Sequence, residues 1–92
     1  PAEIAAKALK KLTKDVYITI DVDVFDPAII PGTGTPEPGG LGWYDVLGIL
    51  RPIFKARNVV GLDVVETCPL KGTNITEFTI AKLIYRLIGY WE

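Results

Sequence analysis

The chain has 92 residues, of which 49% are hydrophobic and 23% are charged, a composition typical of one globular domain that excludes a disordered or collagen-like chain. Ten Lys and Arg residues nearly balance eleven Asp and Glu residues, and the net charge of −1 gives no basic footprint for nucleic acid or an anionic membrane. With one cysteine and no apolar run near the ~20 residues of a membrane-spanning helix, we expect a soluble, cytoplasmic protein.

The sequence contains no Met and no His, and it begins at Pro1 within a predicted helix. We interpret the chain as a piece of a longer protein. Because imidazole is absent, any catalysis within this piece has to depend on carboxylates.

The first half of the chain predicts a helix, a strand and a long loop. Apolar residues recur at helical spacing over residues 1–13. Residues 16–20 form a β-prone apolar run, typical of a strand of a parallel sheet that is covered on both faces. Residues 27–42 are rich in Pro and Gly, which excludes a regular helix or strand there.

The second half predicts helix, strand and helix. An apolar stripe from Trp43 to Phe54 indicates a helix, with a kink or a restart at Pro52. Residues 59–65 predict a second buried strand. A turn then leads to the last helix, where Asn74 and Glu77 have the spacing of a capping box.

This order of elements predicts an α/β fold with a parallel sheet and helices on its faces. Two strands are too few for such a sheet, and a parallel pair leaves edges that need covering. The last helix also needs burial, because only Lys82 and Arg86 are charged between residues 80 and 91. The chain therefore resembles about half of a domain.

Two acids, Asp21 and Asp23, follow the first predicted strand. Residues i and i+2 of a strand point to the same side, roughly 7 Å apart, and ligands bind beyond the carboxyl ends of strands in α/β sheets. Adjacent carboxylates repel each other unless a cation or a shared proton offsets their charge. A hard divalent metal is one solution; the alternative is that both acids only cap the following turn.

Two other readings of this acid run fit less well. A helix–loop–helix calcium site is excluded because Phe25 stands where an oxygen ligand is needed. A phosphatase of the haloacid-dehalogenase type also has Asp-x-Asp after a strand, but its motif has Thr or Val where this chain has Phe25. A phosphate-binding P-loop is not indicated either, since the Gly-rich loop contains no Lys.

The second predicted strand carries acids as well. Asp63 lies within it, where we expect a buried side chain with a hydrogen-bonding role, and Glu66 lies at its end. If the two strands are neighbours, Glu66 lies at the same edge as Asp21 and Asp23. A carboxylate beside a metal-binding pair suits a cationic substrate.

These residues resemble the signature of the ureohydrolases, the family of arginase and agmatinase. The resemblance is carried by Asp21-Val22-Asp23-Val24-Phe25-Asp26-Pro27, by Pro31-Gly32-Thr33-Gly34-Thr35-Pro36 with Gly39-Gly40, and by Gly61-Leu62-Asp63-Val64-Val65-Glu66. It runs from residue 16 to residue 91, and its loop resembles agmatinase more than arginase. The resemblance implies the C-terminal portion of a three-layer α/β/α fold with a parallel sheet.

The resemblance also implies site residues and a reaction. Asp21 would bridge two Mn ions, and Asp23 would ligate one of them. Glu66 would bind the guanidinium of a small cationic substrate, with Thr35 beside it, and Asp21 would pass a proton to the leaving amine. The implied reaction converts agmatine into putrescine and urea, and family members usually assemble as trimers or hexamers.

The chain lacks the family's His-bearing metal motifs, Gly-Gly-Asp-His and Asp-Ala-His-x-Asp, which lie nearer the N-terminus. We therefore expect residues 1–92 to be the C-terminal fragment of a single ureohydrolase domain, inactive without the missing N-terminal part. Alternatives are another guanidino or formimino hydrolase such as arginase, and a catalytically dead association module.

Overall fold

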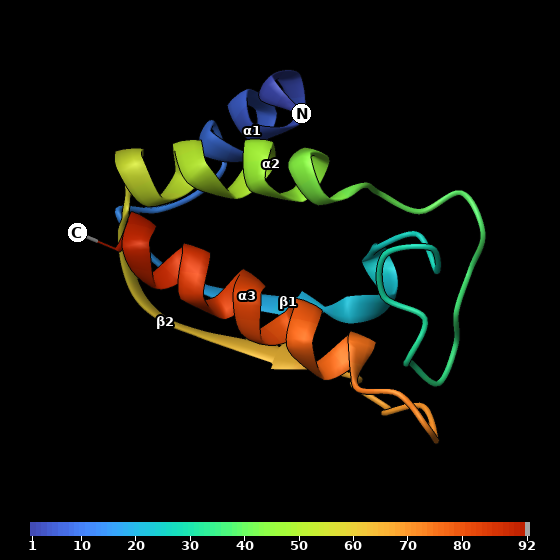
Figure 1. Cartoon of the computed structure of the whole chain (residues 1–92). Helices are drawn as coiled ribbons and strands as arrows, with labels where there is room; N and C mark the ends of the chain where they lie inside the picture. The colour runs from blue at the N-terminus through green and yellow to red at the C-terminus, as the bar shows by residue number, and fades with distance from the viewer. Residues whose placement is uncertain (92) are drawn as a thin grey trace.

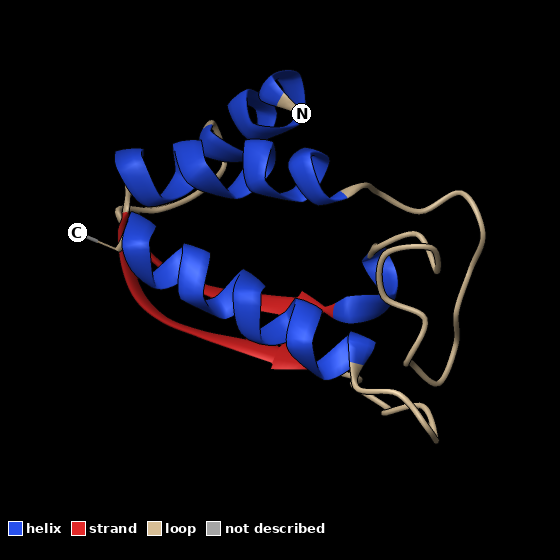
Figure 2. Cartoon of the chain, viewed as in Figure 1, coloured by secondary structure: helices blue, strands red, loops and turns tan. Residues whose placement is uncertain are grey.

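The computed structural model describes residues 1–91 and contains three helices and one pair of strands. In chain order the elements are α1 (Ala2–Leu9), β1 (Asp15–Asp21), a 3-10 turn (Val22–Val24), α2 (Trp43–Ala56), β2 (Asn58–Val65) and α3 (Ile75–Tyr90). Figure 2 shows the strands as a separate layer beside the helices. The α/β class and the predicted order are confirmed.

The two strands run parallel and are hydrogen-bonded neighbours, as predicted. Val16 pairs with Val59 and Tyr17 with Gly61, so Val60 forms a bulge near the start of the pair. The ring of Tyr17 crosses Gly61, where a Cβ atom would lie 2.8 Å from the ring. Glycine at this position therefore allows the aromatic ring to lie against the neighbouring strand.

One face of the sheet is buried and the other is open. Val16, Ile20 and Val59 belong to the hydrophobic core beneath the helices. On the opposite face the side chains of Tyr17 and Val60 are 60% and 61% exposed. The prediction that the first strand is covered on both faces is therefore wrong for residues 1–91, because the three helices of this segment leave one face uncovered.

The helices pack on the buried face of the sheet and on one another. α2 and α3 supply most of the core, and α1 lies against α2 on the side away from the strands (Figure 1). Arg57 holds α1 in place through a hydrogen bond of 2.6 Å from Nη2 to the carbonyl of Leu9. The kink or restart predicted at Pro52 is not a break in the helix, since α2 continues to Ala56.

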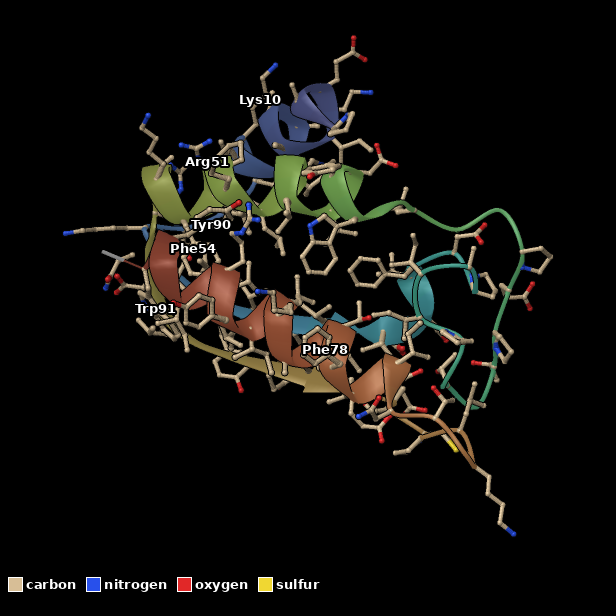
Figure 3. All side chains as sticks on the ribbon, in the orientation of Figure 1. Lys10, Arg51, Phe54, Phe78, Tyr90 and Trp91 are labelled. Carbon is tan, nitrogen blue, oxygen red and sulfur yellow. The ribbon has the colours of Figure 1, made fainter. Side chains whose placement is uncertain are left out.

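The last helix is fixed at its C-terminal end by aromatic residues. Tyr90 and Trp91 both meet the ring of Phe54 edge to face, with ring centroids 6.1 and 5.9 Å apart (Figure 3). Trp91 Nε1 donates a 2.7 Å hydrogen bond to the carbonyl of Val59. This end of α3 is thereby joined to both α2 and β2.

At its N-terminal end α3 differs from the prediction. Asn74 occupies the N-cap position but its side chain makes no capping hydrogen bond, so the predicted capping box with Glu77 is wrong. The hydroxyl of Thr73 accepts a bond of 3.2 Å from the amide of Ile75 instead.

Much of the α3 surface stays exposed within residues 1–91, in particular the side chains of Ile75, Phe78, Tyr85 and Ile88. Figure 3 shows Phe78 well separated from the aromatic group at the other end of the helix. None of the described helices is long and apolar enough to cross a membrane.

Candidate active site

The acids predicted to form a site lie at the carboxyl ends of the two strands. Asp21 is the last residue of β1 and pairs with Val65, the last residue of β2, so that Glu66 follows directly. Both strand arrows point toward the side of the molecule where the long loop lies (Figure 1). The structure therefore brings Asp21, Asp23 and Glu66 to one edge of the sheet, as the sequence predicts.

The two aspartates are not consecutive residues of one strand face. β1 ends at Asp21, and Asp23 lies within the 3-10 turn, so the predicted i, i+2 strand geometry is wrong. Asp21 Oδ1 accepts a hydrogen bond of 3.1 Å from the amide of Asp23. The turn thus brings the backbone of Asp23 to the carboxylate of Asp21, and each carboxylate still has free acceptor positions.

Thr35 is oriented toward the aspartate pair. Its hydroxyl donates a hydrogen bond of 2.8 Å to Asp23 Oδ2. The sequence predicted Thr35 beside Glu66; among residues 1–91 the side-chain hydrogen bond of Thr35 is to Asp23. Thr35 therefore acts first as a residue that orients a carboxylate.

The third acid of the run, Asp26, holds the loop together. Its carboxylate accepts hydrogen bonds from the amides of Ala28 at 2.9 Å and Gly39 at 3.2 Å. Its own amide donates to the carbonyl of Leu41, and the Leu41 amide donates to the carbonyl of Val24. This structural role was not predicted, although Asp before Pro is a common signal for a turn.

The loop is also joined to the exit of β2. Thr33 and Thr67 form an antiparallel bridge, and the amide of Cys68 donates a 2.7 Å bond to the carbonyl of Gly32. The Gly32 amide in turn donates to the buried hydroxyl of Thr76. A Cβ atom at Gly32 would lie 2.7 Å from the carbonyl oxygen of Cys68, so only glycine fits without displacement.

Glu66 occupies an uncommon backbone conformation. Its φ is +68°, and it is the one non-glycine residue among those described with a positive φ. Left-handed backbone at such a residue costs roughly 1–2 kcal/mol and often marks a functional site. The side chain is exposed at the strand end, where its carboxylate can meet a ligand.

Asp63 accepts hydrogen bonds, as predicted, but it is half-buried where the sequence predicted a buried residue. It takes one from the hydroxyl of Tyr17 at 2.9 Å and one from the hydroxyl of Thr19. The hydrogen bond to Asp63 raises the pKa of Tyr17 above its ordinary value of 10.0, with smaller contributions from desolvation and from the carboxylate charge.

The donor set at the strand ends suits part of a metal site. Asp21 and Asp23 provide the oxygen ligands that hard divalent cations prefer. Across residues 1–91 there is no group of three or more His, Cys, Asp or Glu side chains that could hold a metal ion. A metal site at this edge would therefore need further ligands from outside residues 1–91.

A hollow of about 300 Å³ adjoins Asp21 between the end of β1 and α2. Its walls are mainly apolar side chains, among them Val24, Leu41 and Leu50. Asp21 is the one acidic residue of its lining, so the hollow offers a cation fewer partners than the edge that carries Asp21, Asp23 and Glu66.

Comparison with known proteins decides the family. A model of the arginase family matches residues 1–89. The chain belongs to the arginase family. Its fold agrees: over 95% of the chain it superposes on a proclavaminate amidino hydrolase from Streptomyces clavuligerus with a TM-score of 0.83 and 38% identity. The shared fold is arginase-like, and the chain contributes two parallel strands and three helices of it.

Curated arginase-family relatives include an N(1)-aminopropylagmatine ureohydrolase of Synechocystis, 52% identical over 79 residues, which are 86% of this chain. An agmatinase of Pyrococcus horikoshii is 44% identical over 81 residues, or 88% of this chain. The chain spans only 26% and 29% of the lengths of these two relatives. The chain therefore matches only a part of the length of these guanidino hydrolases.

Proposed function

We propose that this chain is the C-terminal part of a binuclear manganese ureohydrolase that converts agmatine into putrescine and urea. The observation that supports this most strongly is the meeting of Asp21, Asp23 and Glu66 at one edge of a parallel sheet. Relatives named as agmatinase and as N(1)-aminopropylagmatine ureohydrolase support a guanidino substrate.

In this proposal Asp21 and Asp23 hold manganese, and two ions complete the whole enzyme. The turn hydrogen bond between the two residues and the Thr35 hydroxyl orient these carboxylates before any ligand binds. When bound, manganese supplies the lowered pKa of water that hydrolysis near neutral pH requires.

Glu66 binds the substrate. A guanidinium presents a planar set of N–H donors that matches a carboxylate in a bidentate pair. The positive φ of Glu66 lowers the stability of the fold, which is consistent with a side chain whose direction is needed for binding. Asp21 would pass a proton to the leaving nitrogen, so that the product departs as a neutral amine and not as a high-energy amide anion.

The test uses a chimera in which this chain replaces the matching segment of the Synechocystis relative. We expect urea release from agmatine that depends on added manganese, with N(1)-aminopropylagmatine and arginine as comparison substrates. Glu66→Gln should lower kcat/KM by about 10- to 100-fold, the usual value of a charged hydrogen bond. Glu37→Gln, an exposed acid in the loop, is the matched control and should behave as the unmodified chimera.

The isolated chain should release no urea, since it supplies only two of the ligands that the two metal ions need. Urea release by the 92-residue chain alone would contradict this. Activity that is highest on arginine or another guanidino compound would replace agmatine with that substrate and leave the reaction class intact.

A second candidate is a catalytically dead association module. The exposed apolar side chains of α3, Phe78 and Ile88 among them, favour this reading because they could pack between subunits. Such a module should bind no manganese in the chimera. Three further points about the chain stay predictions. They are that residues 1–92 are the C-terminal part of a single domain, that the protein assembles as a trimer or hexamer, and that it is cytoplasmic.

A further inference from the structure

The open face of the sheet carries a hydrogen-bonded set of three side chains. Tyr17 and Thr19 on β1 both donate to the carboxylate of Asp63 on β2, the first to Oδ2 at 2.9 Å and the second to Oδ1. Each carboxylate oxygen is therefore held by one hydroxyl from the neighbouring strand. This fixes the carboxylate in one orientation on a face that no described helix covers.

In the strand register, Asp63 lies close to the proposed metal site. Thr19 pairs with Asp63, and Asp21 pairs with Val65. Because side chains two residues apart on a strand share a face, Asp21 and Asp63 lie on the same open face. Two residues of strand span roughly 7 Å, so Asp63 lies one row behind the carboxylate that would hold manganese.

The bonds to Asp63 leave part of its capacity unused. An ionised carboxylate has about four acceptor positions, and the two hydroxyls fill two of them. Both donors are neutral, and within residues 1–91 no cation forms an ion pair with Asp63. A charged carboxylate that is buried under the rest of the domain would gain from a further hydrogen-bond donor.

The missing metal ligands indicate what that donor is. This segment supplies two carboxylates and contains no His. A metal-ligating imidazole regularly donates its second N–H to a carboxylate, which fixes the tautomer and the orientation of the ring. Asp63 is a carboxylate held by two hydroxyls, on the same face as Asp21 and one row away from it.

We propose that Asp63 is a positioning residue of the metal centre. Tyr17 and Thr19 hold its carboxylate, which accepts the N–H of a metal-ligating imidazole from the part of the protein outside this chain. The inference depends on the proposed function, since it assumes that manganese binds at Asp21 and Asp23.

The experiment measures manganese affinity without turnover. In the Synechocystis chimera, Asp63→Asn removes the charge at nearly constant shape, and we expect the Kd for Mn²⁺, from competition with a fluorescent chelator, to rise about 10- to 100-fold. Asp63→Glu should recover part of this affinity. At saturating Mn²⁺ the KM for the guanidino substrate should change less than about twofold, because Asp63 does not touch the substrate.

Tyr17→Phe is the matched control, since it removes one hydrogen bond and keeps the carboxylate. It should raise the Kd for Mn²⁺ only a few-fold. If the three side chains only join the two strands, Tyr17→Phe and Asp63→Asn should weaken Mn²⁺ binding equally and lower Tm equally. That result overturns the inference.

An unchanged Kd for Mn²⁺ in Asp63→Asn, with normal affinity in the unmodified chimera, refutes the positioning role and leaves the proposed function standing. An unmodified chimera that folds but holds no Mn²⁺ refutes both. If Asp63→Asn does not fold, Asp63→Glu decides, and a Kd equal to that of the unmodified chimera counts against the inference.

Discussion

Tyr17 shows how one side chain serves two purposes. Its ring lies over Gly61 of the neighbouring strand, and its hydroxyl reaches Asp63 on the same strand. The hydrogen bond stabilises the neutral phenol beside a negative charge, and the pKa of Tyr17 is raised as a result. The sequence shows only a β-prone aromatic residue here, because the partner is 46 positions away.

This raised pKa predicts how stability depends on pH. The phenol is protonated more firmly in the folded chain than in the unfolded chain, where its pKa is near 10. The stabilisation is therefore complete below pH 10 and is lost as pH rises through the higher folded pKa. Subtracting the tyrosinate absorbance of Tyr17→Phe from that of the chain should show Tyr17 titrating above the ordinary value.

In Asp63→Asn the titration of Tyr17 should return toward pH 10, since the hydrogen bond to a carboxylate is lost and the negative charge is lost with it. A titration of Tyr17 at or below pH 10 in the unmodified chain would show that the bond to Asp63 does not form in solution.

Among the elements, the strands and helices were predictable and the connections between them were not. Periodic apolar residues identified β1, β2 and the three helices within a few residues, and parallel pairing followed from their order. The 3-10 turn that holds Asp23, the bridge from Thr33 to Thr67 and the positive φ of Glu66 depend on contacts between distant segments. Such contacts leave no periodic pattern in the sequence.

The contact between the loop and α3 can be tested with a pair of glycines. Gly32→Ala would place a methyl group 2.7 Å from the carbonyl oxygen of Cys68, which should lower the free energy of unfolding by about 1–3 kcal/mol. Gly34→Ala is the control, since nothing lies within 4 Å of its Cβ position. Urea unfolding of the two chimeras should separate them, and equal midpoints would argue against the close approach of the loop to Cys68 and Thr76.

At the scale of the whole molecule, the two faces of the sheet differ in how far they are covered within residues 1–91. Helices cover one face of the sheet, while Tyr17, Val60 and Val65 remain exposed on the other. Parallel sheets are normally covered on both faces, and relatives are three to four times as long as the 79–81 residues they share with this chain. In Figure 1, α1 and α2 lie to one side of the strand pair and α3 runs across in front of it.

This arrangement predicts a distinctive pattern of amide hydrogen exchange. β1 pairs with β2 along one edge only, so alternate amides of β1 point away from any described partner. In the isolated chain, protection along β1 should alternate from residue to residue. In the chimera the unpaired amides should slow by about tenfold or more, because the rest of the domain covers that edge. Uniform protection in the isolated chain would contradict this, since it requires a partner strand already in place.

The long loop is held by backbone contacts on both of its sides. Asp26, Leu41 and Gly39 bind the loop to itself, and Gly32 and Thr33 bind it to the chain that leaves β2. We expect a loop held by these bonds to keep a fixed position beside the acids. If the proposed function holds, this loop would add no closing step of its own to substrate entry or product release.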